Sequence, residues 1–272
     1  MKKIAQVGLS LFLLAGVVSC GGTSDQESSS AESGTLILEA NGEDFVRQGF
    51  VTKDGWDMQF EHVFVNFAIA KAHQSDPPFA PEGEDELQSQ TTIELVEAPQ
   101  IVDLASGDES APPIQVQEVT APLGTYNALT WSVEPANDGE MGGISVQLVG
   151  IASKDDVVIP FQLNLSDTLS YSCGAYVGDE RKGYLESADT PATVEATFHF
   201  DHIFGDAELD ATDELNEAAI GFAALAELAT EEGLTIDQGQ LAEQLPPDVY
   251  AKLADAIANL GHVGEGHCRL EP

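Results

Sequence analysis

The run WDMQFEHVFVNFAIAKAH, Trp56–His73, decides the fold class of this chain. It is rich in aromatic and β-branched residues, a composition typical of a long β-strand. Shorter runs of the same kind lie on both sides, separated by clusters of Gly, Pro, Asp and Asn: Thr35–Ala40, Ile93–Val96, Ile114–Val119, Tyr126–Val133, Ile144–Ser153, Val157–Leu165 and Val194–Ile203. Parallel strands need helices between them, so this spacing favours antiparallel pairing. We therefore expect a mainly β protein with an antiparallel β-sandwich.

The composition changes after Gly205. In Asp210–Thr230, which is rich in Ala, Leu and Glu, apolar residues recur at steps of three and four, and this predicts one helix. Asp237–Leu245 and Pro247–Leu260 predict two shorter helices, the second with Pro at its start and Gly261 just past its end. We expect a C-terminal helical segment packed on the sandwich, with residues 35–272 forming one structural unit.

The first 34 residues have the features of an export signal and a tether. The basic start Met1–Lys3 precedes the apolar run Ile4–Val18, which is too short to span a bilayer and is typical of a secretory signal peptide over residues 1–19. The signal ends in Val-Val-Ser-Cys, which resembles the lipobox of bacterial lipoproteins. That resemblance implies that Cys20 carries acyl chains and anchors the protein to a membrane, with residues 20–34 as a flexible tether. The expected location is the cell envelope, facing the periplasm or the exterior.

The charge of the chain excludes several partners. It has 47 acidic and 10 basic residues, a formal net charge of −37. Nucleic acids and anionic lipid headgroups repel so negative a protein, and we expect no nucleic-acid partner. Apolar residues make up 43% of the chain, too many for a disordered acidic polymer.

Two cysteines remain when the lipidated Cys20 is set aside, Cys173 and Cys268. Outside the cytoplasm such a pair is expected to form a disulfide, and there is no C-x-x-C spacing to favour a redox or metal-thiolate pair. The disulfide would fasten the tail Gly261–Cys268 to the segment Ser172–Gly183.

Histidines are the main candidates for a functional site. Four of the six fall in two short segments, FHFDHIFGD (Phe198–Asp206) and GHVGEGHC (Gly261–Cys268). Strand alternation places His62 and His202 on the core side of their strands, and His73 is expected to be exposed. If the disulfide brings the tail to the sheet, His62, either His199 or His202, and either His262 or His267 can converge. The candidate carboxylates beside them are Asp201, Asp206 and Glu265.

Imidazoles with carboxylates are the ligands preferred by divalent transition metals such as Zn²⁺ and Cu²⁺. For any single histidine, a structural or surface role is the preferred explanation. Calcium is a second, weaker hypothesis, because acidic residues and Thr212 between Asp206 and Glu217 match the ligand positions of a calcium loop. Ala211, however, stands where such a loop needs glycine for its turn, and an acidic helix N-terminus explains the same residues.

Three segments, DGWDMQFEHV, FHFDHIFGDAE and LGHVGEGHC, make the chain resemble a family of extracytoplasmic bacterial lipoproteins. The tripeptide Gly124-Thr125-Tyr126 is also similar to a strand entry found in β-sandwich lipoproteins of the MbnP-like type. These resemblances imply an envelope lipoprotein and supply neither an activity nor site residues.

The function expected from the sequence is a lipid-anchored protein that captures, buffers or delivers a divalent transition metal, with a metal transporter or another envelope protein as partner. The alternative is a structural or adhesive surface lipoprotein without metal. No nucleophile–base pair or cofactor motif indicates an enzyme.

Overall fold

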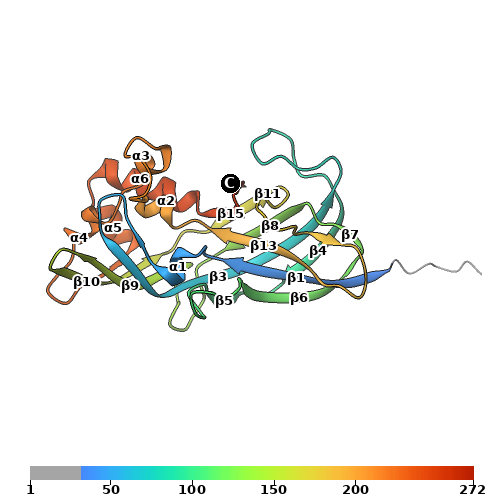
Figure 1. Ribbon diagram of the computed structural model, residues 1–272, viewed down its shortest axis with the longest axis horizontal. Coiled ribbons are helices and arrows are strands. Elements are labelled where there is room, and N and C mark those ends of the chain that lie inside the picture. Colours follow the sequence, from blue (N-terminus) through green and yellow to red (C-terminus); the bar gives the residue numbers. More distant parts are fainter. Residues whose placement is uncertain (1–31) are drawn as a thin grey trace, which may run out of the picture. The chain divides into compact units, whose positions relative to one another are not determined.

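The computed structural model describes residues 32–272, which form a mainly β structure with short helices (Figure 1). The predicted signal peptide, Cys20 and nearly all of the tether lie in residues 1–31, outside the described residues. The strands are β1 (Ser33–Asn41), β2 (Phe50–Val51), β3 (Asp57–Ser75), β4 (Ser89–Val96), β5 (Gln100–Asp103), β6 (Ile114–Pro122), β7 (Gly124–Thr125), β8 (Ala128–Val133), β9 (Val146–Lys154), β10 (Val157–Leu165), β11 (Leu169–Cys173), β12 (Tyr184–Leu185), β13 (Ala192–Phe198), β14 (Leu234–Asp237), β15 (Gly261–Val263) and β16 (Gly266–Leu270). The helices are α1 (Phe45–Gln48), α2 (Asp201–Phe204), α3 (Glu214–Ala218), α4 (Ala223–Ala226), α5 (Gln238–Gln244) and α6 (Pro247–Ala258).

Most strands belong to one continuous sheet with the order β14-β10-β9-β3-β8-β11-β16-β15-β13-β1-β6, and β2, β4 and β5 also pair with β3. The sheet is mixed, because β1 runs parallel to β13 and β10 runs parallel to β14. The expected antiparallel sandwich is therefore not confirmed. Each parallel pair joins segments far apart in the chain, and a local strand pattern does not indicate which distant strand becomes the neighbour.

Strand β3 is the centre of the sheet, since it pairs with β2, β4, β5, β8 and β9. Its register against β9 shifts between Phe60 and His62. Met58 is buried before this bulge, and Val63 and Val65 are buried after it. An extra residue in a strand exchanges the two faces. The prediction that His62 faces the core is therefore wrong.

An aromatic cluster fills the core beneath the later strands. The ring of Trp131 lies 4.5 Å from that of Tyr171 and 4.9 Å from that of Phe198, measured between centroids. Strand β15 packs directly on this cluster: a Cβ atom at Gly261 would lie 2.6 Å from the ring of Tyr171. Only glycine therefore lets β15 lie this close to the core, and the residue that follows is His262.

Helices α2 to α6 lie together near one end of the sheet, beside β9 and β10, whereas α1 lies apart from them, next to β3 (Figure 1). The single helix predicted over Asp210–Thr230 is wrong, because the chain breaks between α3 and α4. Ala219 is extended and Gly221 has a φ of +73°. Lys53 donates to the carbonyls of Asn216 and Ala219, and Asp54 accepts from the amides of Phe222 and Ala223. These contacts satisfy backbone groups that a continuous helix would have paired internally.

After α6 the chain returns to the sheet as the hairpin of β15 and β16. The predicted disulfide is confirmed, with Cys173 of β11 and Cys268 of β16 joined across paired strands whose Cα atoms are 4.3 Å apart. It fastens the tail to the sheet as expected. Within residues 32–272, none of the helices combines the length and the apolar character that a transmembrane segment requires.

Candidate metal centre

The end of β13 and the turn that follows it position two histidines, His199 and His202. The prediction that this strand continues to Ile203 is wrong, because it stops at Phe198 and the short helix α2 begins at Asp201. Gly205, with a φ of +68°, closes the turn by donating to the carbonyl of Asp201. In a continuous strand His199 and His202 would face opposite sides of the sheet. The turn instead brings their ring centroids within 5.8 Å of each other.

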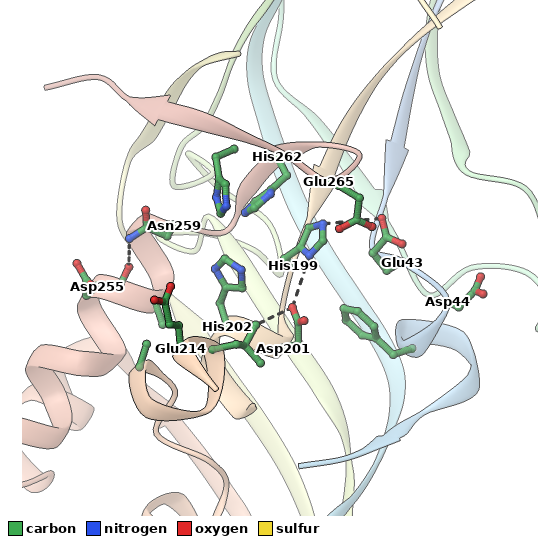
Figure 2. Close-up of a pocket in the computed structure, with 15 residues that line it drawn as sticks. Glu43, Asp44, His199, Asp201, His202, Glu214, Asp255, Asn259, His262 and Glu265 are labelled. Atoms are coloured by element: carbon green, nitrogen blue, oxygen red, sulfur yellow. Dashed lines mark hydrogen bonds and ion pairs between the residues drawn. The ribbon is translucent and has the colours of Figure 1, made fainter. Parts of the chain in front are cut away.

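The other two histidines come from the C-terminal hairpin. His262 of β15 is paired with Thr197 of β13 and with His267 of β16. Its ring centroid lies 4.2 Å from that of His199, 5.0 Å from that of His202 and 4.7 Å from that of His267. Figure 2 shows the rings of His199, His202 and His262 directed toward one another. We call these four residues the histidine cluster, and His262 is its central member.

The histidine cluster lines a cavity of about 620 Å³. Its walls also carry Phe45 and the helices α3 and α6. Carboxylates and one amide surround the imidazoles, and no Lys or Arg is among the lining residues: the polar side chains are Glu43, Asp44, Asp201, Glu214, Asp255, Asn259 and Glu265. Ligand atoms of His199, Asp201 and His202 all lie within 4.8 Å of one another, a spacing that one ion can bridge.

Burial favours the uncharged form of His262 and His202. His262 is 3% exposed, and desolvation, assisted by the three neighbouring histidines, lowers its pKa to about 2. Desolvation also lowers the pKa of His202, against the opposing charge of Asp201. The pKa of Glu43 is raised by burial, although His199 acts in the opposite direction. The Nδ1 atom of His262 is buried and has no hydrogen-bond partner among the described residues.

The hydrogen bond of His199 determines which of its nitrogens is free. Nε2 lies 3.2 Å from the carbonyl oxygen of Gly264, and because a carbonyl only accepts, Nε2 carries the proton. In the neutral ring Nδ1 is then the nitrogen with a free lone pair, and it lies 3.7 Å from Asp201. A backbone carbonyl that orients an imidazole in this way is a common support for a metal ligand.

A buried polar network lies behind His199. The amide of Gly264 donates to the hydroxyl of Thr197 (2.7 Å), and that hydroxyl donates to Glu195 (2.9 Å). Glu195 forms an ion pair with Lys182, which also binds Glu39 at 2.8 Å. Burial opposes the charge of Lys182, but hydrogen bonds and charges of the two glutamates raise its pKa above the usual range. The network fixes the loop whose carbonyl orients His199.

Not every predicted residue belongs to this site. His202 and His267 join His199 and His262, and Asp201 and Glu265 line the cavity. His62 does not line it: its Nδ1 atom lies 2.8 Å from Asp103 and its ring stacks on Phe64. Asp206 is likewise absent from the lining residues.

The calcium hypothesis meets a specific obstacle at Asp206. The loop that follows winds around the buried side chain of Asn216, which accepts from the amide of Asp206 and donates to the carbonyls of Asp206 and Asp210. An amide therefore occupies the position that a cation takes at the centre of a calcium loop.

His73 is buried, so the prediction that it is exposed is wrong. Its Nδ1 atom lies near the hydroxyls of Ser89 and Thr92, and its Nε2 atom lies 2.9 Å from the hydroxyl of Thr130. Burial lowers its pKa to about 4. With hydroxyl neighbours on both nitrogens and no carboxylate among them, this imidazole has a structural role.

Sequence reasoning missed the carboxylates Glu43, Asp44 and Asp255, and it considered Glu214 only as part of a calcium loop. Glu43 reaches the cavity because β1 lies parallel to β13 and ends in a turn, where Asn41 accepts from the amide of Glu43. The Asn-Gly pair at positions 41 and 42 signals that turn, but nothing in the sequence places it beside His199. Comparisons with protein-family models, with curated proteins and with solved structures found no match to this chain.

Proposed function

We propose that this protein binds a divalent transition metal between His199, Asp201 and His202, whose ligand atoms lie within 4.8 Å of one another, and that the adjoining imidazole of His262 completes the ligand set. The observation that carries the proposal is the Nδ1 atom of His262, buried and unpaired amid three other imidazoles. A buried polar atom without a partner costs about 1–3 kcal/mol. A metal ion bound at this nitrogen removes that cost and gives a reason for the clustering.

The donor set narrows the choice of metal. The cavity offers imidazole nitrogen and carboxylate oxygen but no cysteine or methionine sulfur. Such a set favours Zn²⁺, Cu²⁺ or Ni²⁺, whereas Cu⁺ prefers sulfur ligands. Carboxylates without imidazole would have favoured Ca²⁺ or Mg²⁺. We expect zinc and copper to be the tightest ligands.

The proposed role is capture, buffering or delivery at the cell envelope. The lipobox at Cys20 supports a lipid anchor, and the strongly acidic surface attracts cations to the protein. His267 is the exposed member of the histidine cluster, so it is suited to receive a metal from solvent or pass it to a transporter or another envelope protein. Replacement of Cys20 by Ala is expected to move the protein from the membrane fraction to the soluble fraction.

Metal binding is tested on the full chain, purified in detergent without chelator or affinity tag. Elemental analysis and calorimetry with Zn²⁺ and Cu²⁺ are expected to show about one tightly bound ion per chain. Loss of an orienting partner alone costs about 10–100-fold in affinity, so His262→Ala is expected to cost at least about 100-fold. His202→Ala, at a half-buried position, repeats the test with less risk to folding.

The control is His62→Ala, which removes an imidazole outside the cavity. It is expected to leave the zinc affinity unchanged. A wild-type protein that binds neither zinc nor copper would refute the proposal and favour the structural or adhesive alternative. Equal losses in His62→Ala and His262→Ala would show that binding occurs elsewhere.

A further inference from the structure

The cavity is much larger than a metal ion requires. Its volume of about 620 Å³ lies within the range of about 300–1,000 Å³ that is usual for small-molecule sites, whereas one water molecule takes about 30 Å³. The histidine cluster forms only part of the wall. Apolar side chains from two other elements, Leu215 of α3 and Ala256 of α6, line the space beside it, and Phe45 of α1 lines it as well.

The charges around the cavity restrict what can fill this space. Figure 2 shows Glu214 and Asp255 on one side of the imidazoles and Glu43 with Glu265 on the other. No Lys or Arg lines the cavity to offset these carboxylates. An anion such as phosphate or a carboxylate is repelled by these acidic residues, whereas a positively charged group is attracted.

We propose that the cavity holds, beside the metal, a small organic amine that coordinates the metal through one neutral nitrogen and places a second, positively charged nitrogen near Glu214 and Asp255. The carbon chain between the two nitrogens lies against Leu215 and Ala256. This inference rests on the proposed metal site and adds that the metal keeps a coordination position open to a ligand. The protein then recognises a metal together with an amine, either bound in sequence or taken up as one complex.

The test uses the full chain loaded with Co²⁺, whose visible absorption reports its coordination. The probes are imidazole, a neutral nitrogen donor; histamine, which adds an ammonium group; and acetate, an anion of similar size, all at pH 8 and one ionic strength. Imidazole and histamine are expected to change the spectrum, and acetate is not. Attraction between the ammonium group and the exposed carboxylates of Glu214 and Asp255 is expected to make histamine bind roughly five- to tenfold more tightly than imidazole. Cobalt content is measured after each titration to exclude removal of the metal.

The position of the ammonium group is tested by the double variant Glu214→Gln/Asp255→Asn. Its preference for histamine over imidazole is expected to fall to about one. The matched control is Glu82→Gln/Glu84→Gln, which removes the same charge from exposed residues of the proline-rich loop and is expected to keep the preference.

The possible failures are distinguishable. A chain that binds no cobalt refutes the proposed function and this inference with it. A cobalt spectrum that none of the probes changes shows a closed metal site and refutes the inference alone. Acetate binding as tightly as histamine, or an unchanged histamine preference in Glu214→Gln/Asp255→Asn, refutes the assignment of an amine.

Discussion

Replacement of Lys182 by Met is expected to be among the most destabilising single changes in this protein. The side chain of Lys182 is 5% exposed and that of its partner Glu195 is 1% exposed. Methionine retains most of the apolar stem but leaves the Glu195 carboxylate buried without a counter-ion, which costs about 3–5 kcal/mol. With an m-value of about 2–3 kcal/mol/M, the midpoint of urea unfolding falls by roughly 1–2 M. The double variant Lys182→Met/Glu195→Gln is expected to recover most of this loss, because glutamine carries no charge and its oxygen still accepts from Thr197.

The measurement is urea unfolding followed by circular dichroism, with Lys71→Met as the control. Lys71 also forms an ion pair, with Glu94 at 3.1 Å, but the two side chains are 36% and 54% exposed. Such a pair contributes at most about 1 kcal/mol. Equal losses for Lys182→Met and Lys71→Met would refute the argument from burial. A double variant no more stable than Lys182→Met would show that the loss comes from packing rather than from an unpaired charge.

Three further expectations concern the fold and its link to the histidine cluster. Between about pH 6.5 and pH 4 the unfolded chain protonates His73 and the folded protein does not, because burial lowers its pKa to about 4. As the pH is lowered through this window, the free energy of unfolding therefore falls by up to about 3 kcal/mol. Urea titrations of His73→Gln should show a smaller fall. The same pH dependence in the variant and the wild type would contradict this expectation. The disulfide joins Cys173 and Cys268, which are 95 residues apart, and its reduction is expected to lower the free energy of unfolding by at most about 4–5 kcal/mol. Reduction is also expected to weaken zinc binding. If calorimetry finds the same zinc affinity with and without reductant, the disulfide does not support the metal site. Gly261→Ala introduces a methyl group 2.6 Å from the ring of Tyr171 and is expected to lower the free energy of unfolding by about 1–3 kcal/mol, measured by thermal or urea unfolding. A variant as stable as the wild type would show that β15 can move away from Tyr171 without loss of stability.

The strands and the disulfide follow from local and compositional signals. Aromatic and β-branched runs mark β3, and cysteine pairing outside the cytoplasm requires no knowledge of the fold. The disulfide also explains why part of the site could be predicted. Once Cys268 is joined to the sheet, His262 and His267 must come with it, and their approach to β13 needs only one more strand pair.

The errors arise at local irregularities of the strands and where distant strands pair. A bulge at Phe60–His62 exchanges the faces of β3, so alternation counted from Trp56 gives the wrong side for His62. The turn at Phe200 ends β13 early and brings His202 to the same side as His199. The position of Glu43 depends on the parallel pairing of β1 with β13, which the sequence around Glu43 does not encode. Long-range pairing is settled by the whole core and not by any one segment.

All four imidazoles of the histidine cluster lie between Cys173 and Cys268 in the chain, so the disulfide encloses them in one covalent ring. A protease that cuts once in the exposed residues between Asp206 and Asp213 opens this ring without separating its parts. The fragment that carries His199 and the fragment that carries His262 stay bonded through sulfur. Nicked protein thus keeps both halves of the site at a high local concentration and can close again around a metal, whereas the same cut after reduction leaves the halves free to diffuse apart.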